Sequence, residues 1–167
     1  MKKIILSALL CLSVSFAFAQ NIFVKNDQVA NLTLGVGHGV PLELSYEYCV
    51  LDNLFGDENC SLGVGGFFGW SHYSNKYDGL RHHKNMIRFG VKSAIHYNFI
   101  ANLDTYAGLM FGYRGVHEHW KGNTRDHIRA SFDFLLGARY YFDKNWAAVA
   151  EFGAEQSYFR VGVAYKF

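Results

Sequence analysis

The sequence predicts an all-β protein, folded as a closed antiparallel eight-stranded transmembrane β-barrel. Three observations favour this fold: an N-terminal export signal, eight segments in which bulky apolar residues alternate with small or charged ones, and a last segment that ends in phenylalanine. No segment shows a convincing helical periodicity, and Pro41 is the only proline. The fold class therefore depends on the alternating segments.

The N-terminus has the three parts of a secretory signal. A pair of lysines precedes a short apolar run over residues 4–16, and Ala17-Phe18-Ala19 then supplies the small residues of a cleavage site. The run is too short for a transmembrane helix, which needs about 20 residues. We expect residues 1–19 to be a cleaved signal peptide and residues 20–167 to be the mature barrel domain.

The charge of the mature chain is close to zero. The whole sequence has 16 Lys and Arg against 14 Asp and Glu, and cleavage removes Lys2 and Lys3, which leaves 14 of each sign. A protein without a net basic field has no general attraction for nucleic acid. We therefore expect no nucleic-acid partner.

Alternation with a period of two residues is clearest over residues 84–99. Ile87 and Phe89 fall on one face of the predicted strand, whereas Arg88 and Lys92 fall on the other. An even number of antiparallel strands places both chain ends on the same side of a sheet. The other seven predicted strands are residues 30–37, 41–49, 61–71, 104–115, 128–142, 146–153 and 158–167.

Alternation alone does not decide which face points into the barrel. A soluble barrel of the lipocalin type would bury the bulky residues, and that reading is the alternative here. Two features oppose it: glycines crowd the small face, which suits the narrow interior of eight strands, and Tyr and Trp lie near the ends of the apolar face. We therefore predict that the apolar face contacts outer-membrane lipid.

The opposite face carries charges of both signs, which predicts mutual pairing inside the barrel. A plugged, salt-bridged interior is favoured over a hydrated lumen, which in eight strands would pass only small ions. The predicted interior network comprises Glu43, Glu47, Arg88, Lys92, Asp104, Arg114, Arg129, Asp133, Arg139, Glu151, Arg160 and Lys166.

Connection lengths predict the orientation, because outer-membrane barrels have short periplasmic turns and longer external loops. The predicted external connections are residues 37–41, 72–84, 116–127 and 154–157, and the periplasmic ones are 50–60, 99–103 and 143–145. Cys49 and Cys60 bracket the first periplasmic connection and are predicted to form a disulfide in an oxidising compartment. Parity places the two cysteines on opposite faces, so one must lie beyond its regular strand, and two free thiols are the alternative.

The last six residues, Gly162-Val163-Ala164-Tyr165-Lys166-Phe167, resemble the C-terminal assembly signal of outer-membrane barrels. Gly162, Tyr165 and Phe167 occupy the characteristic positions, although Val161 replaces the usual polar residue before the glycine. The mature chain resembles the eight-stranded barrels of the outer-membrane protein X type and the transmembrane domain of outer-membrane protein A. The resemblance implies a monomer in the bacterial outer membrane, inserted by the barrel-assembly machinery, and leaves the external loop ligand unknown.

Two constellations provide alternatives to a non-enzymatic barrel without cofactor or metal. Histidines are concentrated in or beside the predicted external connections, and His117 and His119 share one face, so a metal site is one alternative. The seven histidines are His38, His72, His82, His83, His117, His119 and His127.

The second alternative is a hydrolase. His72-Tyr73-Ser74-Asn75 resembles the His-x-Ser-Asn stretch of outer-membrane lipid A deacylases, in which His72 would activate Ser74. The stretch stands early in the chain, and Asp78 would be a poor substitute for the expected carboxylate. The interpretation we favour is a structural or surface-interaction barrel that acts through its external loops.

Overall fold

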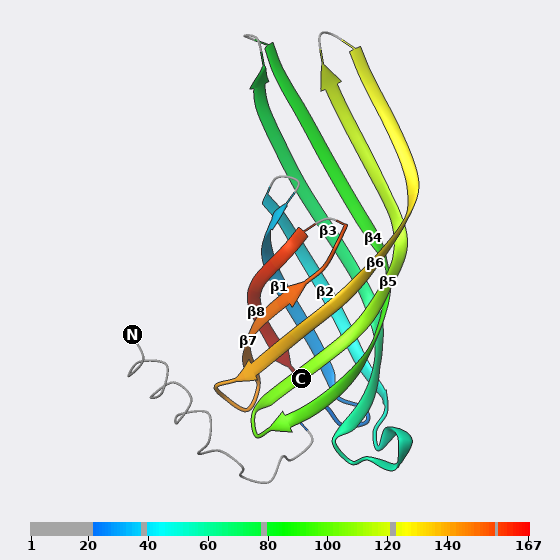
Figure 1. Ribbon diagram of the computed structural model, residues 1–167, viewed down its shortest axis with the longest axis vertical. Coiled ribbons are helices and arrows are strands. Elements are labelled where there is room, and N and C mark those ends of the chain that lie inside the picture. Colours follow the sequence, from blue (N-terminus) through cyan, green and yellow to red (C-terminus); the bar gives the residue numbers. More distant parts are fainter. Residues whose placement is uncertain (1–21, 38–39, 78–79, 121–122, 156) are drawn as a thin grey trace, which may run out of the picture.

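The computed structural model describes residues 22–37, 40–77, 80–120, 123–155 and 157–167, so the predicted signal peptide lies outside the described residues. A short 3-10 turn, η1 (Leu54–Gly56), separates the second strand from the third. The eight strands are β1 (Gln28–Gly37), β2 (Val40–Leu51), β3 (Cys60–Tyr77), β4 (Leu80–Ile100), β5 (Leu103–Trp120), β6 (Asn123–Tyr141), β7 (Trp146–Phe152) and β8 (Ser157–Lys166) (Figure 1).

The strands form one closed barrel in which each strand pairs with its neighbours in chain order. All pairings are antiparallel, and β1 closes the ring against β8, with Val29 opposite Lys166. Closure pairs the backbone groups that would otherwise form two sheet edges. The predicted fold is therefore confirmed. In the described part of the chain, no helix is long and apolar enough to cross a membrane.

The apolar face of the barrel points outward. On β4, Arg88 and Lys92 are buried in the lumen, whereas Phe89 and Val91 are 53% and 62% exposed. Trp146 and Tyr165 lie on this outer surface with ring centroids 4.9 Å apart, at the end of the barrel where β1 begins and β8 ends. The predicted orientation places this end at the periplasm, so we call it the periplasmic end and the opposite one the external end. The alternating pattern predicted that the bulky apolar residues face outward and the charged residues face the lumen, and the structure confirms this. The outward apolar residues form a belt that suits contact with lipid.

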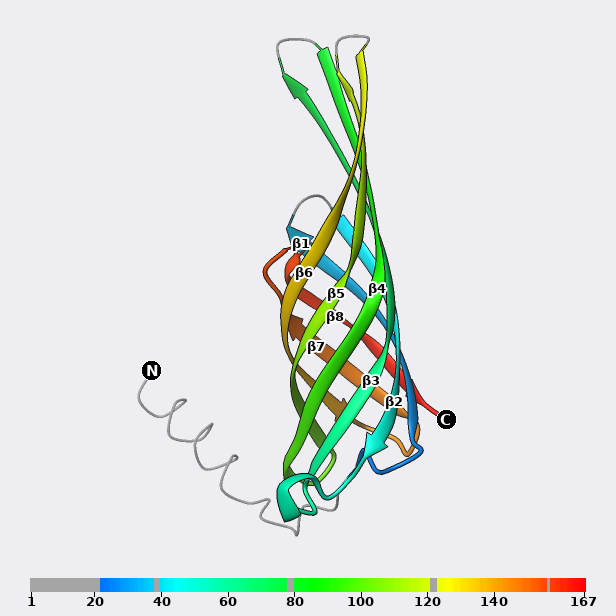
Figure 2. The same ribbon diagram turned by 90° about the vertical axis from the view of Figure 1, so that its right-hand side faces the viewer.

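The four central strands are much longer than the others. Strands β3 to β6 have 18 to 21 residues, whereas β1, β2, β7 and β8 have 7 to 12. The two hairpins β3–β4 and β5–β6 consequently extend far beyond the rest of the barrel (Figures 1 and 2). A transmembrane strand needs about 9 to 11 residues, so much of each hairpin lies outside the bilayer.

This extension corrects two predicted boundaries. Residues 72–84 and 116–127 were expected to be external loops, but strand pairing continues through most of them, with Ser74 opposite His83 and His117 opposite Asp126. The physical reason is that both faces of these segments are polar above the membrane. A strand that lacks an apolar face shows no apolar alternation, although its backbone pairing is unchanged.

The predicted disulfide is also corrected, since Cys49 and Cys60 are free and buried. Cys49 lies opposite Gly63 and faces the lumen, where its Sγ is 3.7 Å from the carbonyl oxygen of Phe23. Cys60 lies opposite Tyr97, with the parity of the outward residue Leu62. The two thiols thus keep the opposite faces that strand parity assigns, and neither leaves its strand to form a bridge.

Candidate functional site

The lumen is filled by a charged cluster whose central member is Glu47 on β2. One carboxylate oxygen of Glu47 accepts from the Arg139 guanidinium and lies 3.5 Å from Lys92 Nζ, and its other oxygen is 2.8 Å from His96 Nε2. Arg139 also donates to Asp104 over 3.1 Å. Since β2 and β6 are not neighbours, the Glu47–Arg139 pair spans the lumen. Ion pairs of this kind close the interior by linking opposite walls.

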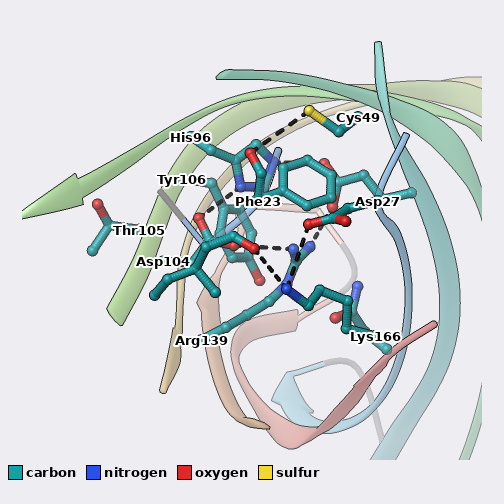
Figure 3. Close-up of polar contacts among 12 residues, drawn as sticks. Phe23, Asp27, Cys49, His96, Asp104, Thr105, Tyr106, Arg139 and Lys166 are labelled. Atoms are coloured by element: carbon teal, nitrogen blue, oxygen red, sulfur yellow. Dashed lines mark hydrogen bonds and ion pairs between the residues drawn. The ribbon is translucent and has the colours of Figure 1, made fainter. Parts of the chain in front are cut away.

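His96 is an interior residue that reasoning from sequence did not include in the network. Its ring is fully buried, and its Nδ1 lies 2.8 Å from Asp104 Oδ1 while its Nε2 reaches Glu47 (Figure 3). Both carboxylates only accept hydrogen bonds, so both ring nitrogens must carry a proton. His96 is therefore an imidazolium in this arrangement. The sequence did contain one indication of this role, since His96 falls on the same face of β4 as Arg88 and Lys92.

A second set of ion pairs lies closer to the external end. Arg160 on β8 donates to Glu43 over 2.8 Å, and its Nε lies 3.1 Å from Glu151. Tyr106 donates its hydroxyl to Glu151 over 2.7 Å, and its ring lies 4.5 Å beneath the Arg139 guanidinium. Tyr106 thus links the two sets of ion pairs. Tyr106 was not predicted from the sequence to belong to this network, because it is a bulky aromatic residue on the mostly small or polar face of β5.

The chain before β1 folds back and closes the periplasmic end. Phe23 is fully buried in a cluster with Val29 and Tyr141, and its ring lies against His96 (Figure 3). Lys166 Nζ holds this segment from β8, because it donates to the Ile22 carbonyl over 2.9 Å. This segment has no alternating pattern, so nothing in the sequence indicated that it enters the barrel.

The external end is closed by the connection between β7 and β8. Asp133 accepts hydrogen bonds from the backbone N–H groups of Ala154 and Glu155, over 2.8 and 3.1 Å. These bonds hold the connection inside the open end of the barrel, which we call the mouth. The Glu155 carboxylate there accepts from Ser131 and lies 3.0 Å from Arg114. Glu155 was assigned to an external loop, and its role as a lumen carboxylate was not foreseen.

Most residues of the predicted interior network lie in the lumen, but three lie at its ends. Arg129 is exposed above the mouth, Arg114 is partly exposed beside it, and Lys166 lies at the periplasmic rim. Nine are buried and lie in the lumen, namely Glu43, Glu47, Arg88, Lys92, Asp104, Asp133, Arg139, Glu151 and Arg160.

Of the histidines predicted as a metal alternative, the side chains of His72, His83, His117 and His127 are described, and all four lie on the long hairpins. His117 contacts Asp126 over 2.5 Å, and the His72 ring lies 6.0 Å from that of His83. Within the described residues, no group of three or more His, Cys, Asp and Glu side chains could hold a metal ion. His38 and the side chains of His82 and His119 lie outside the described residues. This geometry does not support the metal alternative.

The hydrolase alternative also gains no support. His72 and Ser74 share the outer face of β3, and His72 Nδ1 is 2.7 Å from Asn85 Oδ1. An amide in this position does not supply the charge with which a carboxylate orients a catalytic histidine. The suggested substitute, Asp78, lies outside the described residues.

Comparisons with known structures agree with the barrel geometry. The attachment invasion locus protein Ail of Yersinia pestis is 13% identical, with a TM-score of 0.53 over 86% of this chain and 100% of that one. The N-terminal β-barrel domain of Pseudomonas aeruginosa OprF is 15% identical, with a TM-score of 0.60 over 86% and 98%. A designed transmembrane β-barrel is 18% identical, with a TM-score of 0.54 over 86% and 97%. At such identities the similarity shows the fold alone.

No curated protein matches the chain. A family model described as "Helicobacter outer membrane protein" matches residues 52–167, which is most of the sequence and includes β3 to β8. With the closed barrel and its outward apolar belt, this match assigns the protein to the bacterial outer membrane. The chain belongs to the Helicobacter outer membrane protein family.

Proposed function

We propose that this protein is a non-enzymatic, non-conducting membrane anchor that presents the outer parts of β3 to β6 as a contact surface. The observation that carries the proposal is the difference in strand length, since 18 to 21 residues far exceed one bilayer crossing. At about 3.3 Å per residue, roughly eight surplus residues extend each strand by about 25 Å. We call this four-stranded extension the protruding sheet; its described residues are 71–77, 80–86, 115–120 and 123–128.

The filled lumen supports the anchor half of the proposal. Arg88, Arg139 and Arg160 are almost completely buried and ion-paired, and they occupy the space through which solutes would pass. Phe23 and Glu155 close the two ends of the same lumen. We therefore expect no stepwise ion conductance in planar bilayers. Stable open-channel steps would show that the lumen is hydrated and would overturn this half.

The rigidity of the protruding sheet supports the contact half. Paired strands hold side chains in fixed rows, unlike a flexible loop, and fixed rows reduce the ordering cost of binding. Lys84 and Glu118 form an ion pair of 3.4 Å across β4 and β5 in this sheet. Its described side chains include the exposed polar residues His72, Ser74 and Asp126, which suit contact with water and partners rather than with lipid.

Exposure can be tested with single cysteines in a background in which Cys49 and Cys60 are serine. Ser74→Cys on the protruding sheet should react with a membrane-impermeant maleimide on intact cells. Phe55→Cys is the matched control, because Phe55 is 87% exposed but lies in η1 at the periplasmic end. It should react only after the outer membrane is permeabilised. The reverse pattern would invert the proposed orientation.

The contact role is tested by shortening both hairpins. A variant in which β3–β4 and β5–β6 are each closed just above the membrane should still fold and shift in gel mobility on heating. Cells that display it should lose attachment to one another or to epithelial cells, relative to cells with the full barrel. If the shortened barrel folds and attachment is equal, the protruding sheet is not a contact surface.

A further inference from the structure

Three arginines form one row across the inner face of the barrel mouth. Arg88 on β4 lies opposite Arg114 on β5, and Arg114 lies opposite Arg129 on β6. Arg88 is buried, Arg114 is partly exposed and Arg129 is exposed, so the row runs from the lumen to the solvent-exposed base of the protruding sheet. Like charges directly opposite one another on adjacent strands repel. This arginine row therefore needs anions beside it.

Two carboxylates neutralise the row only in part. Asp133 lies 3.4 Å from Arg88, and Glu155 lies 3.0 Å from Arg114 and 3.7 Å from Arg88. No described residue forms an ion pair or hydrogen bond with Arg129. Three guanidinium groups thus meet two carboxylates, and the surplus positive charge lies on the solvent side.

Donor groups in the row are also unused. Among the described residues, the buried Nε of Arg114, which lines the cavity beside the row, has no hydrogen-bond acceptor. Nε and Nη2 of Arg88 also lack an acceptor, but Arg88 is fully buried in the lumen and does not line that cavity. A buried donor without an acceptor costs about 1 to 3 kcal/mol. The flat guanidinium group suits the oxygens of phosphate or sulfate, which accept two parallel hydrogen bonds. The row therefore has both the charge and the free donors of an oxyanion site.

A cavity of about 280 Å³ lies beside the row, between the arginines and the Lys84–Glu118 pair. All of its lining residues lie on β4, β5 and β6, and these strands extend beyond the short strands β1, β2, β7 and β8 (Figures 1 and 2). The lining residues are Lys84, Arg114, Val116, Glu118, His127 and Arg129.

We propose that the arginine row is a binding site for a phosphate or sulfate group, and that Glu155 is the internal carboxylate that occupies part of it. Glu155 is held in place by Ser131 and by its own backbone N–H, which donates to Asp133. The bound group would lie in the cavity and accept from Arg114 and Arg129, in competition with Glu155 for Arg114. The site deepens the proposed contact role, because it gives the inner side of the protruding sheet a ligand class.

The test uses the mature barrel refolded in detergent micelles, with inorganic pyrophosphate as the probe in calorimetric titration. Arg114→Gln and Arg129→Gln should each weaken binding at least about tenfold, because each removes a charge-assisted hydrogen bond. Arg125→Gln is the matched control: it lies on the same strand and face as Arg129 but does not line the cavity. It should retain the affinity within about twofold, and the gel mobility shift checks that every variant is folded.

Removal of the competing Glu155 carboxylate should have the opposite effect and strengthen pyrophosphate binding. Glu155→Gln should bind pyrophosphate several-fold more tightly, whereas Asp126→Asn, an equal charge change on the outer face of β6, should not. Absence of binding to the folded wild-type barrel, equal losses for Arg125→Gln and Arg129→Gln, or equal gains for the two acidic variants would each overturn the site.

The source of the anion is distinguished in lipid nanodiscs. If a lipid headgroup supplies the phosphate, phosphatidylglycerol discs should block pyrophosphate binding and phosphatidylcholine discs should not. If a soluble polyanion supplies it, the two discs should give equal affinities. Failure of the anion site leaves the conductance and surface-labelling results unchanged, so it can be told apart from failure of the proposed function.

Discussion

The ring of Phe23 lies against the ring of His96 inside the periplasmic end of the barrel, with centroids 4.4 Å apart. Residues that precede the first strand are thereby joined to the charged centre of the lumen. The Arg139 guanidinium lies 5.7 Å from the same phenyl ring, so Phe23 shields two cations from the periplasm. Figure 3 shows these side chains converging from the chain before β1, from β4 and from β6.

Phe23→Ala should destabilise the folded barrel by about 3 kcal/mol, because it leaves a cavity in a buried cluster. The measurement is urea unfolding of the mature protein in lipid vesicles, followed by tryptophan fluorescence. Phe55→Ala provides the control, since Phe55 is 87% exposed and should change the unfolding free energy by less than about 0.5 kcal/mol. Equal effects of the two variants would show that Phe23 does not close the barrel.

His96 should carry protons on both ring nitrogens at neutral pH, since each nitrogen lies 2.8 Å from a carboxylate oxygen. Nitrogen-15 NMR of histidine-labelled protein in micelles measures this directly, through two ring N–H signals protected from exchange. His96→Gln assigns the signals by removing them. A neutral-imidazole spectrum would mean that one carboxylate has turned away from His96.

Gly112→Ala should prevent correct closure, whereas Gly115→Ala should be tolerated. A Cβ atom at Gly112 would lie 2.0 Å from the Phe89 carbonyl oxygen and 2.7 Å from the Gly90 Cα on the opposite strand. Backbone cannot move aside as a flexible side chain can. A Cβ at Gly115, three residues along the same strand, meets nothing within 4 Å. The fraction of refolded protein that shifts in gel mobility on heating compares the two variants.

Phe167→Ser should slow insertion in cells with little effect on refolding in micelles. The Phe167 ring is 67% exposed, and the residue is anchored by its backbone N–H, which donates to the Gln28 carbonyl over 3.0 Å. The side chain lies exposed beside the Tyr165 ring, as recognition by the predicted assembly machinery would require, while the backbone completes the β1–β8 pairing. Protease-resistant barrel in outer-membrane fractions measures insertion. An equal loss in cells and in micelles would make Phe167 a structural residue instead.

Strand parity predicted the barrel because the membrane imposes a strict chemical difference between the two faces. Each outward residue such as Phe89 meets lipid, and each inward residue such as Arg88 meets the narrow lumen. The same reasoning failed where the difference disappears. His72 and Ser71 are both polar and lie above the apolar belt, so the outer parts of the long strands resembled loops.

Contacts across the lumen were less accessible to sequence reasoning. Glu47 meets Arg139, 92 positions away, because strand tilt brings opposite walls to the same level. Composition shows that charges balance but not which residues pair. The closing segments were harder still, since Phe23 and Glu155 lie outside every alternating stretch. Phe23 is positioned by packing in a buried cluster and Glu155 by hydrogen bonds to Ser131 and Asp133, and neither follows a repeating pattern.

The pairing of β1 with β8 has a consequence for how the protein is made. Val29 and Lys166 are partners, so β1, which is synthesised first, must wait for β8 before its free edge is covered. Contacts this distant in sequence are slow to form, and an uncovered strand edge invites pairing with other chains. The outer edge of β1 therefore stays uncovered until β8 has been made. Because the two chain ends adjoin, a circularly permuted version with new ends in the β5–β6 connection should close around the same lumen.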